Sequence, residues 1–256
     1  MIETVDLSIS FGGHLAVDHV TCAFHNDALT AIVGPNGAGK TTYFNLLSGQ
    51  LRPSSGKVVL AGHDVTRAGP AKRSKLGIAR GFQLANLFPT LTLLENVRLA
   101  VQAHVRPHDD FTSLACRDTL VIDKARACLN TVGLLPRAED FPTVLSHGGQ
   151  RRLEFALLLA MERPIWLLDE PTAGMAAEEV PIILNLIRSI RADGARTILL
   201  VEHKMDVLRS LADRVVVLHN GRLVADGTPG EVMRADIVQE AYLGVGGKAA
   251  GRQQWA

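Results

Sequence analysis

The clearest chemical signal in the sequence is a loop, Gly34–Thr42, that fits the pattern G-x-x-x-x-G-K-[ST]. Its glycines let the backbone curve, so that successive N–H groups face one concave side and suit phosphate oxygens. Lys40 can reach the β- and γ-phosphates of a nucleotide, and Thr41 offers a hydroxyl to Mg²⁺. The predicted phosphate-binding residues are Gly34, Pro35, Asn36, Gly37, Ala38, Gly39, Lys40, Thr41 and Thr42.

The elements around this loop support the prediction. Leu29–Val33 is apolar and predicts a buried strand that leads into the loop. Thr41–Ser48 predicts a helix that leads out of it and stops at Gly49. The positive end of that helix dipole would add to the anion site. Strand, loop and helix together predict a P-loop for ATP or GTP.

An acidic pair follows a second apolar run. Ile165–Leu168 is short and continuously apolar, which is typical of a parallel strand buried on both faces. Asp169 and Glu170 come directly after it, at the carboxyl end where open α/β sheets bind ligands. Asp169 is therefore a candidate to hold Mg²⁺, usually through water, and Glu170 a candidate to accept a proton from the attacking water.

A third segment, Leu145–Glu154, opens a predicted helix. Ser146 is a good N-cap, and Gly148 would let an anion approach the backbone. Taken by itself, the segment indicates only an ordinary capped helix.

The remaining elements are predicted from periodicity and turn residues. Leu7–Phe11, residues 15–24 and Lys57–Ala61 indicate an antiparallel layer, and residues 81–163 are mainly helical in pattern. Further predictions are a helix over Pro181–Arg191, a strand over Thr197–Val201, and a hairpin of Arg214–His219 and Arg222–Ala225 across Asn220-Gly221.

Composition narrows the class of protein. A chain of 256 residues with 47% hydrophobic residues can bury a large core. The net charge of +1 argues against broad electrostatic binding of nucleic acid. No apolar run approaches the roughly 20 residues that cross a bilayer, and the start of the chain lacks the pattern of a signal peptide. Three scattered cysteines indicate a reducing compartment.

In their order along the chain, these motifs resemble the nucleotide-binding subunit of an ABC transporter. The resemblance implies an α/β fold: a P-loop NTPase (RecA-like) core with an antiparallel β subdomain and an α-helical subdomain at about 84–163. One nucleotide-binding domain would cover 1–244, and 245–256 would form a flexible tail. The family's motifs would be the Walker A at Gly34–Thr42, the signature at Leu145–Gln150 and the Walker B at Asp169 and Glu170. Phe11 would stack on the adenine, Gln83 would contact Mg²⁺ and sense the membrane partner, and His203 would contact the γ-phosphate.

The resemblance also implies a mechanism. Two such subunits would face each other head to tail, with each ATP between one Walker A and the opposite signature helix, where Ser146 and Gly148 lie. ATP binding would close the pair, and hydrolysis would reopen it. The motion would drive permease subunits supplied by other chains, with this subunit peripheral at the cytoplasmic face of the membrane.

A finer resemblance is to the ATPases of branched-chain amino acid importers. It rests on Gly77–Gln83, Phe88–Asn96 and Glu240–Gly244. ATPases with these features also belong to transport systems for urea, other amides and aromatic acids. Such systems commonly pair two different ATPase chains and receive cargo from an external binding protein.

Two departures from the family pattern stand out, Gly149 in the signature and Ala176 in the D-loop. They put the rate and symmetry of the dimer in doubt and favour a mixed pair. The alternatives are a soluble ABC ATPase that remodels nucleic acid or ribosomes, a lipopolysaccharide-export ATPase, and a phosphotransferase, which would leave the signature and His203 without a role.

Overall fold

The computed structural model describes residues 1–81, 87–105, 119–194 and 196–235, apart from the side chains of residues 205 and 206. The chain divides into two compact units, which are considered separately. The first combines Met1–Gly69 with Leu200–Ala256, and the second is Pro70–Leu199. The bounds of the nucleotide-binding domain and of its helical subdomain stay predictions, and the tail 245–256 lies outside the described residues.

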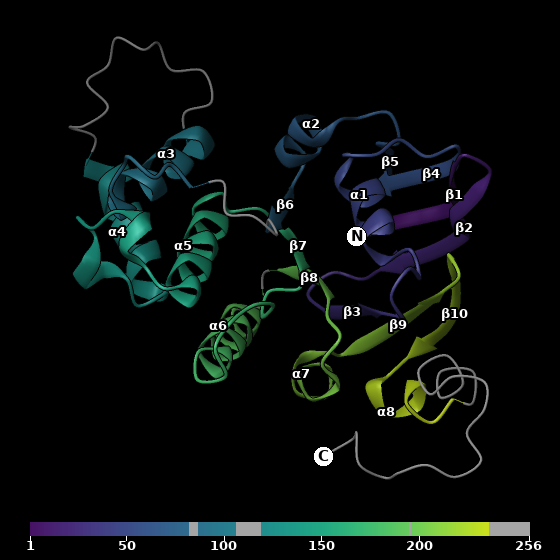
Figure 1. The fold of residues 1–256 in the computed structure, drawn as a ribbon. Coiled ribbons are helices and arrows are strands. Elements are labelled where there is room, and N and C mark those ends of the chain that lie inside the picture. Colours follow the sequence, from purple (N-terminus) through teal and green to yellow (C-terminus); the bar gives the residue numbers. More distant parts are fainter. Residues whose placement is uncertain (82–86, 106–118, 195, 236–256) are drawn as a thin grey trace. The chain divides into compact units, whose positions relative to one another are not determined.

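The elements of the first unit are β1 (Ile2–Phe11), β2 (His14–Phe24), β3 (Leu29–Val33), α1 (Lys40–Ser48), β4 (Ser55–Leu60), β5 (His63–Asp64), α7 (Met205–Leu211), β9 (Arg214–His219), β10 (Arg222–Gly227) and α8 (Pro229–Val232) (Figure 1). Those of the second unit are α2 (Pro70–Lys75), β6 (Ile78–Gly81), α3 (Leu93–Val105), α4 (Thr119–Thr131), the 3₁₀ turns Leu135–Arg137 and Pro142–Val144, α5 (His147–Ala160), β7 (Ile165–Asp169) and α6 (Val180–Ala192). Strand β8 (Thr197–Val201) begins in the second unit and ends in the first.

The first unit contains the predicted antiparallel layer, in the order β2-β1-β4-β5. Strand β1 is longer than the prediction of Leu7–Phe11, because it begins at Ile2 and pairs there with Phe24 and Leu60. Asp6 and His19 both have φ of 52°, and the β1–β2 register shifts between Thr4 and Leu7. This bulge interrupts the two-residue alternation, and the sequence pattern therefore revealed only the second half of the strand.

The same unit carries the strand that leads into the P-loop. In the order β10-β9-β3, strand β3 runs parallel to β9, and β9 forms the predicted antiparallel hairpin with β10. Asn220 and Gly221 have φ of 48° and 78°, the left-handed backbone that a two-residue Asn-Gly hairpin turn requires. Leu208 of α7 and Val232 of α8 pack with Ala31 and Val33 of β3, so α7 and α8 cover this part of the sheet (Figure 1).

The second unit contains strands in the order β8-β7-β6, with β6 parallel to β7. Helix α5 packs on these strands through Phe155, whose ring lies 6.3 Å from that of Trp166 on β7. Helices α3 and α4 contribute buried aliphatic residues, including Val97, Val101 and Leu129. The described part of residues 82–163 is thus mainly helical, as its pattern indicates.

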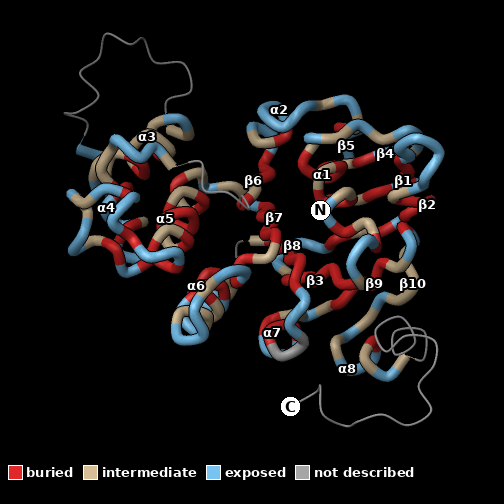
Figure 2. The backbone as a smooth tube through the Cα atoms, viewed as in Figure 1, coloured by how far each residue is buried: buried red, intermediate tan, exposed pale blue. Residues whose placement is uncertain are grey.

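Burial identifies the strands that position charged side chains. Strands β3, β7 and β8 are buried at every residue, and Figure 2 shows them red along their length. Each of these strands is followed by a polar or charged segment, and the buried strand fixes the position at which that segment begins. Among the residues that the structure describes, no helix is long and apolar enough to cross a membrane.

Candidate nucleotide-binding site

The P-loop lies between β3 and α1, where the sequence places it. The Lys40 side chain is buried, with 6% of the residue exposed. Its ammonium donates hydrogen bonds to the carbonyl oxygens of Gly34 (2.7 Å) and Pro35 (2.9 Å). The lysine therefore ties the start of the loop to the start of the helix, and its charge is held within the loop.

The start of α1 is suited to an anion. Gly39 is the N-cap, with φ of 94°, and within the described part of the chain no side chain caps the helix. The first turn of α1 also contains no acidic residue. Because the N–H groups of a first helical turn have no partner within the helix, they can bind phosphate oxygens here.

Backbone groups from parts of the chain distant in sequence hold the P-loop in place. The N–H of Gly221, in the β9–β10 turn, donates to the carbonyl of Ala38 (3.1 Å), and Asp18 of β2 donates to the carbonyl of Gly221 (2.9 Å). A Cβ atom on Gly39 would lie only 2.2 Å from the carbonyl oxygen of Ala16. The sequence predicted the hairpin, but it gave no sign that its turn holds the P-loop.

Phe11 and His203 also lie in the first unit, and neither is a core residue. Phe11 ends β1 and is 50% exposed, so its ring is accessible for stacking. His203 follows β8 and is exposed, while Glu202 before it is 3% exposed. The Glu202 carboxylate accepts a hydrogen bond from the backbone N–H of His203 (2.9 Å). Both side chains are therefore accessible for the ligand contacts predicted for them.

The acidic pair lies in the second unit, at the end of β7. Asp169 is 2% exposed, and its Oδ2 accepts from Nη2 of Arg80 on β6 (3.3 Å). Burial lowers the pKa of Arg80, and the charge of Asp169 opposes that shift. Glu170 is half-buried with φ of 48°, a strained conformation for this residue type. The Arg80 partner was missed from sequence, and Gln83 lies outside the described residues.

The signature segment begins α5, as predicted. Ser146 is the N-cap, and its Oγ accepts a hydrogen bond from the N–H of Gly149 (3.1 Å). The same hydroxyl donates to Oε1 of Glu179 (2.7 Å). The Glu179 carboxylate also covers Gly148, because a Cβ built there would lie 2.4 Å from its Cδ. The sequence analysis did not single out Glu179.

The two departures from the family pattern lie in this unit. Gly149 is buried, and a Cβ on it would lie 3.1 Å from Cβ of Leu145. A side chain at 149 would therefore require Leu145 to shift by a few tenths of an ångström. Ala176 is exposed, and its carbonyl accepts a hydrogen bond from the N–H of Glu179 (3.0 Å). The backbone at Ala176 thus helps to place Glu179.

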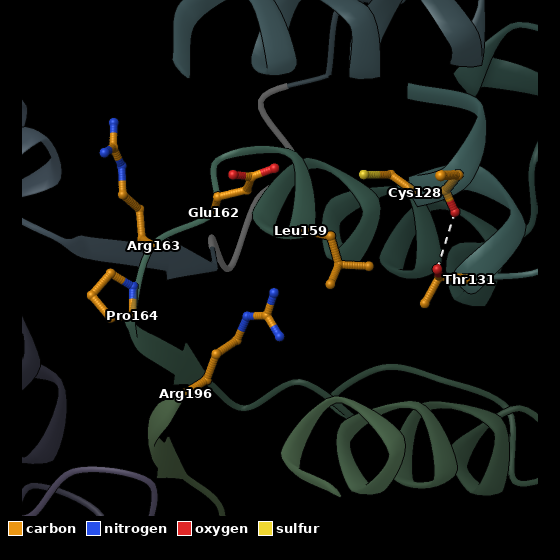
Figure 3. A pocket seen from close by; sticks show the side chains of 8 residues that line it. Cys128, Thr131, Leu159, Glu162, Arg163, Pro164 and Arg196 are labelled. Carbon is orange, nitrogen blue, oxygen red and sulfur yellow. Dashed lines mark hydrogen bonds between the residues drawn. The ribbon is translucent and has the colours of Figure 1, made fainter. Parts of the chain in front are cut away.

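A separate cavity of about 370 Å³ lies in the second unit. In Figure 3, the Arg196 guanidinium and the Cys128 sulfur point toward its interior, whereas the Arg163 side chain points away. The Arg196 guanidinium lies 5.3 Å from the Trp166 ring centroid, and burial raises the pKa of the Cys128 thiol. None of the predicted site residues lines this cavity.

Comparisons with known proteins agree with the motifs. The family model for ABC transporters matches residues 17–173. LivG of Escherichia coli strain K12, described as a high-affinity branched-chain amino acid transport ATP-binding protein, is 34% identical over 95% of this chain and 98% of its own. BraF of Pseudomonas aeruginosa, with the same description, is 34% identical with the same coverage. The ADP form of MJ1267, an ABC transporter cassette, superposes with a TM-score of 0.82 at 27% identity, covering 96% of this chain and 99% of that one.

The chain therefore belongs to the ABC transporter family and is one of its ATP-hydrolysing cassettes. The α/β P-loop fold predicted from the sequence is confirmed. The roles of individual site residues rest on the geometry above and are taken up as proposals below.

The P-loop geometry yields a matched pair of substitutions. Gly37 and Gly39 both have left-handed φ, 81° and 94°, but only Gly39 faces backbone where a Cβ would clash. Gly37→Ala should lower the free energy of unfolding by about 1–2 kcal/mol, because of backbone strain alone. Gly39→Ala should cost at least about 2 kcal/mol more, since the loop must move away from Ala16. Urea unfolding measures both, and equal losses would contradict the packing described.

Proposed function

We propose that the chain is the ATP-binding and hydrolysing subunit of an importer for branched-chain amino acids or related small polar solutes. The proposal rests on the P-loop, whose buried Lys40 anchors it to a helix start that no side chain in the described part of the chain caps. The substrate class rests on the likeness to LivG and BraF, which extends over nearly the whole of both chains. ATP hydrolysis would drive transport through separate permease subunits.

The P-loop residues bind the triphosphate. The N–H groups of the loop and of the first turn of α1 surround the phosphate oxygens, and Lys40 turns its ammonium from loop carbonyls to the β- and γ-phosphates. Phe11 stacks on the adenine through its exposed ring.

The donor set fits a magnesium ion. The described residues contain no group of three or more His, Cys, Asp or Glu side chains that would hold a metal alone. Mg²⁺ is usually held by one or two protein oxygens together with phosphates and water, and the Thr41 hydroxyl and the Asp169 carboxylate are ligands of that kind. Gln83 is the third proposed ligand. When bound, the ion would neutralise charge on the phosphates.

The catalytic residues act on water and the γ-phosphate. Glu170, half-buried beside the end of β7, accepts a proton from the attacking water. His203 donates a hydrogen bond to the γ-phosphate, while Glu202 holds the backbone at that point. Gln83 reports the state of the site to the permease.

The cassette acts in a pair, with Ser146 and Gly148 binding the ATP of the partner. A related cassette, MJ0796, is described as dimeric and has a TM-score of 0.77 with this chain at 26% identity, covering 90% of this chain and 99% of that one. Gly149 in the signature and Ala176 in the D-loop support a mixed pair with a second ATPase, because a mixed pair confines the altered signature to one site. The permease would place the pair at the cytoplasmic face of the membrane, and the external binding protein would act indirectly.

The permease contact lies around residues 83–89. Phe88 is 55% exposed, an unusual position for a large aromatic residue. The buried Asn96 fixes the backbone at Phe88, because its Oδ1 accepts from the N–H of Phe88 (2.8 Å) and its Nδ2 donates to the carbonyl of Phe88 (3.1 Å). An exposed aromatic ring on a backbone that is held at Phe88 suits a partner helix in a groove.

Glu170→Gln should keep ATP binding and lose turnover. The amide retains the shape of the side chain but cannot accept a proton, and positioned bases contribute about 10²–10⁴-fold. Nucleotide titration and phosphate release measure the two effects. Hydrolysis at the wild-type rate would show that another group serves as the base.

Phe88→Asp should abolish co-purification with the permease and leave the ATPase activity of the isolated chain unchanged, because the ring is exposed and supports no core. Leu120→Asp on α4 is the matched control, since Leu120 is 54% exposed. Affinity purification from detergent-solubilised membranes, with an ATPase assay, measures both. Loss of the isolated chain's ATPase activity in Phe88→Asp would indicate a core role instead of docking.

A further inference from the structure

The start of α5 already binds an anion that belongs to the chain itself. Oε1 of Glu179 lies 2.7 Å from the Ser146 hydroxyl that caps the helix. Both carboxylate oxygens lie 2.6 Å from the position of a Cβ on Gly148, so the group rests against the backbone there. A carboxylate at a helix N-terminus is stabilised by the dipole and by the donors around it.

The occupant comes from the segment that follows the acidic pair. Glu179 is the N-cap residue of α6, and its backbone N–H donates to the carbonyl of Ala176 (3.0 Å). Glu179 is half-buried, while its neighbour Glu178 is exposed. The three atoms nearest to a Cβ on Gly148 all belong to the end of the Glu179 side chain, and a rotation of that side chain would move them away from the helix start.

We propose that Glu179 is a displaceable internal competitor of ATP at the signature helix. This inference rests on the proposed function, in which Ser146 and Gly148 bind the ATP of the partner. The carboxylate and a phosphate are both anions that require the same hydroxyl and the same backbone face, so they exclude each other. ATP closes the pair only after the carboxylate has rotated away, and Glu179 thereby raises the ATP concentration at which closure occurs.

Removal of Glu179 should change ATP-dependent closure in opposite directions, depending on whether Glu179 competes with ATP or only positions Ser146. If Glu179 only positioned Ser146, its removal would weaken both the fold and ATP-dependent closure. If it competes with ATP, its removal weakens the start of α5 but strengthens closure. Glu179→Gln retains size and a possible hydrogen bond to Ser146 and removes the charge.

The test uses the chain with Glu170→Gln, so that ATP is not consumed. The variant is produced together with the second ATPase and the permease that the proposed function assigns to it. Association of the cassettes is followed by cross-linking against the concentration of Mg·ATP. Glu179→Gln should lower the half-maximal ATP concentration about tenfold, equivalent to about 1.4 kcal/mol. Glu178→Gln makes the same charge change one residue away and should leave it unchanged.

The outcomes separate the two proposals. If Glu179→Gln associates at a half-maximal Mg·ATP concentration equal to or higher than that of the parent, Glu179 does not compete with ATP. The proposed function would stand in that case, because closure itself occurs. An equal decrease in Glu178→Gln would show a general charge effect and would overturn the competitor as well. No ATP-dependent association in the parent with intact Glu179 would contradict the proposed function, and the competitor with it.

Discussion

A buried charge must have a partner, and this constraint applies to three residues of the candidate site. Strands β3, β7 and β8 are buried at every residue; Lys40 begins the helix after β3, Asp169 ends β7, and Glu202 directly follows β8. These residues are 6%, 2% and 3% exposed. An uncompensated buried charge would cost several kcal/mol, so each one is held by a specific contact. Lys40 binds loop carbonyls, Asp169 binds Arg80, and Glu202 binds the backbone of His203.

These contacts prepare the chain for a ligand with charge of both signs. The Lys40 ammonium is a cation at the place where phosphate is proposed to bind. The Arg80 guanidinium is a cation bound to Asp169, the aspartate proposed as a ligand of Mg²⁺. Glu179 holds an anion at the signature helix. ATP with its metal would therefore exchange these internal contacts, one ion pair and two sets of charge-assisted hydrogen bonds, for ligand contacts. Part of the binding free energy is spent on that exchange, so the internal partners influence the ATP affinity.

The sequence predicted features that depend on neighbouring residues. The strand and helix around the P-loop, the Asn220-Gly221 turn and the Ser146 cap all follow from local rules, and the structure contains each of them. The partners that hold the charges could not be predicted in this way. Arg80 and Asp169 are 89 residues apart, and Ser146 and Glu179 are 33 apart. No local periodicity relates such pairs, because only the packing of β6 on β7 and of the segment after β7 on α5 brings them together.

The central claim is that Lys40 transfers its charge from the loop carbonyls to the phosphates of ATP. Isothermal titration of ATP into Lys40→Ala tests it directly, with Lys57→Ala on β4 as the control, since Lys57 is an exposed lysine of the same unit. Lys40→Arg should not restore binding, because the guanidinium lacks the compact charge of the ammonium. The account predicts that Lys40→Ala raises the dissociation constant at least about 100-fold, equivalent to about 2.7 kcal/mol, and that Lys57→Ala leaves it unchanged. An affinity of Lys40→Ala within about threefold of wild type, or about 0.7 kcal/mol, would contradict the account.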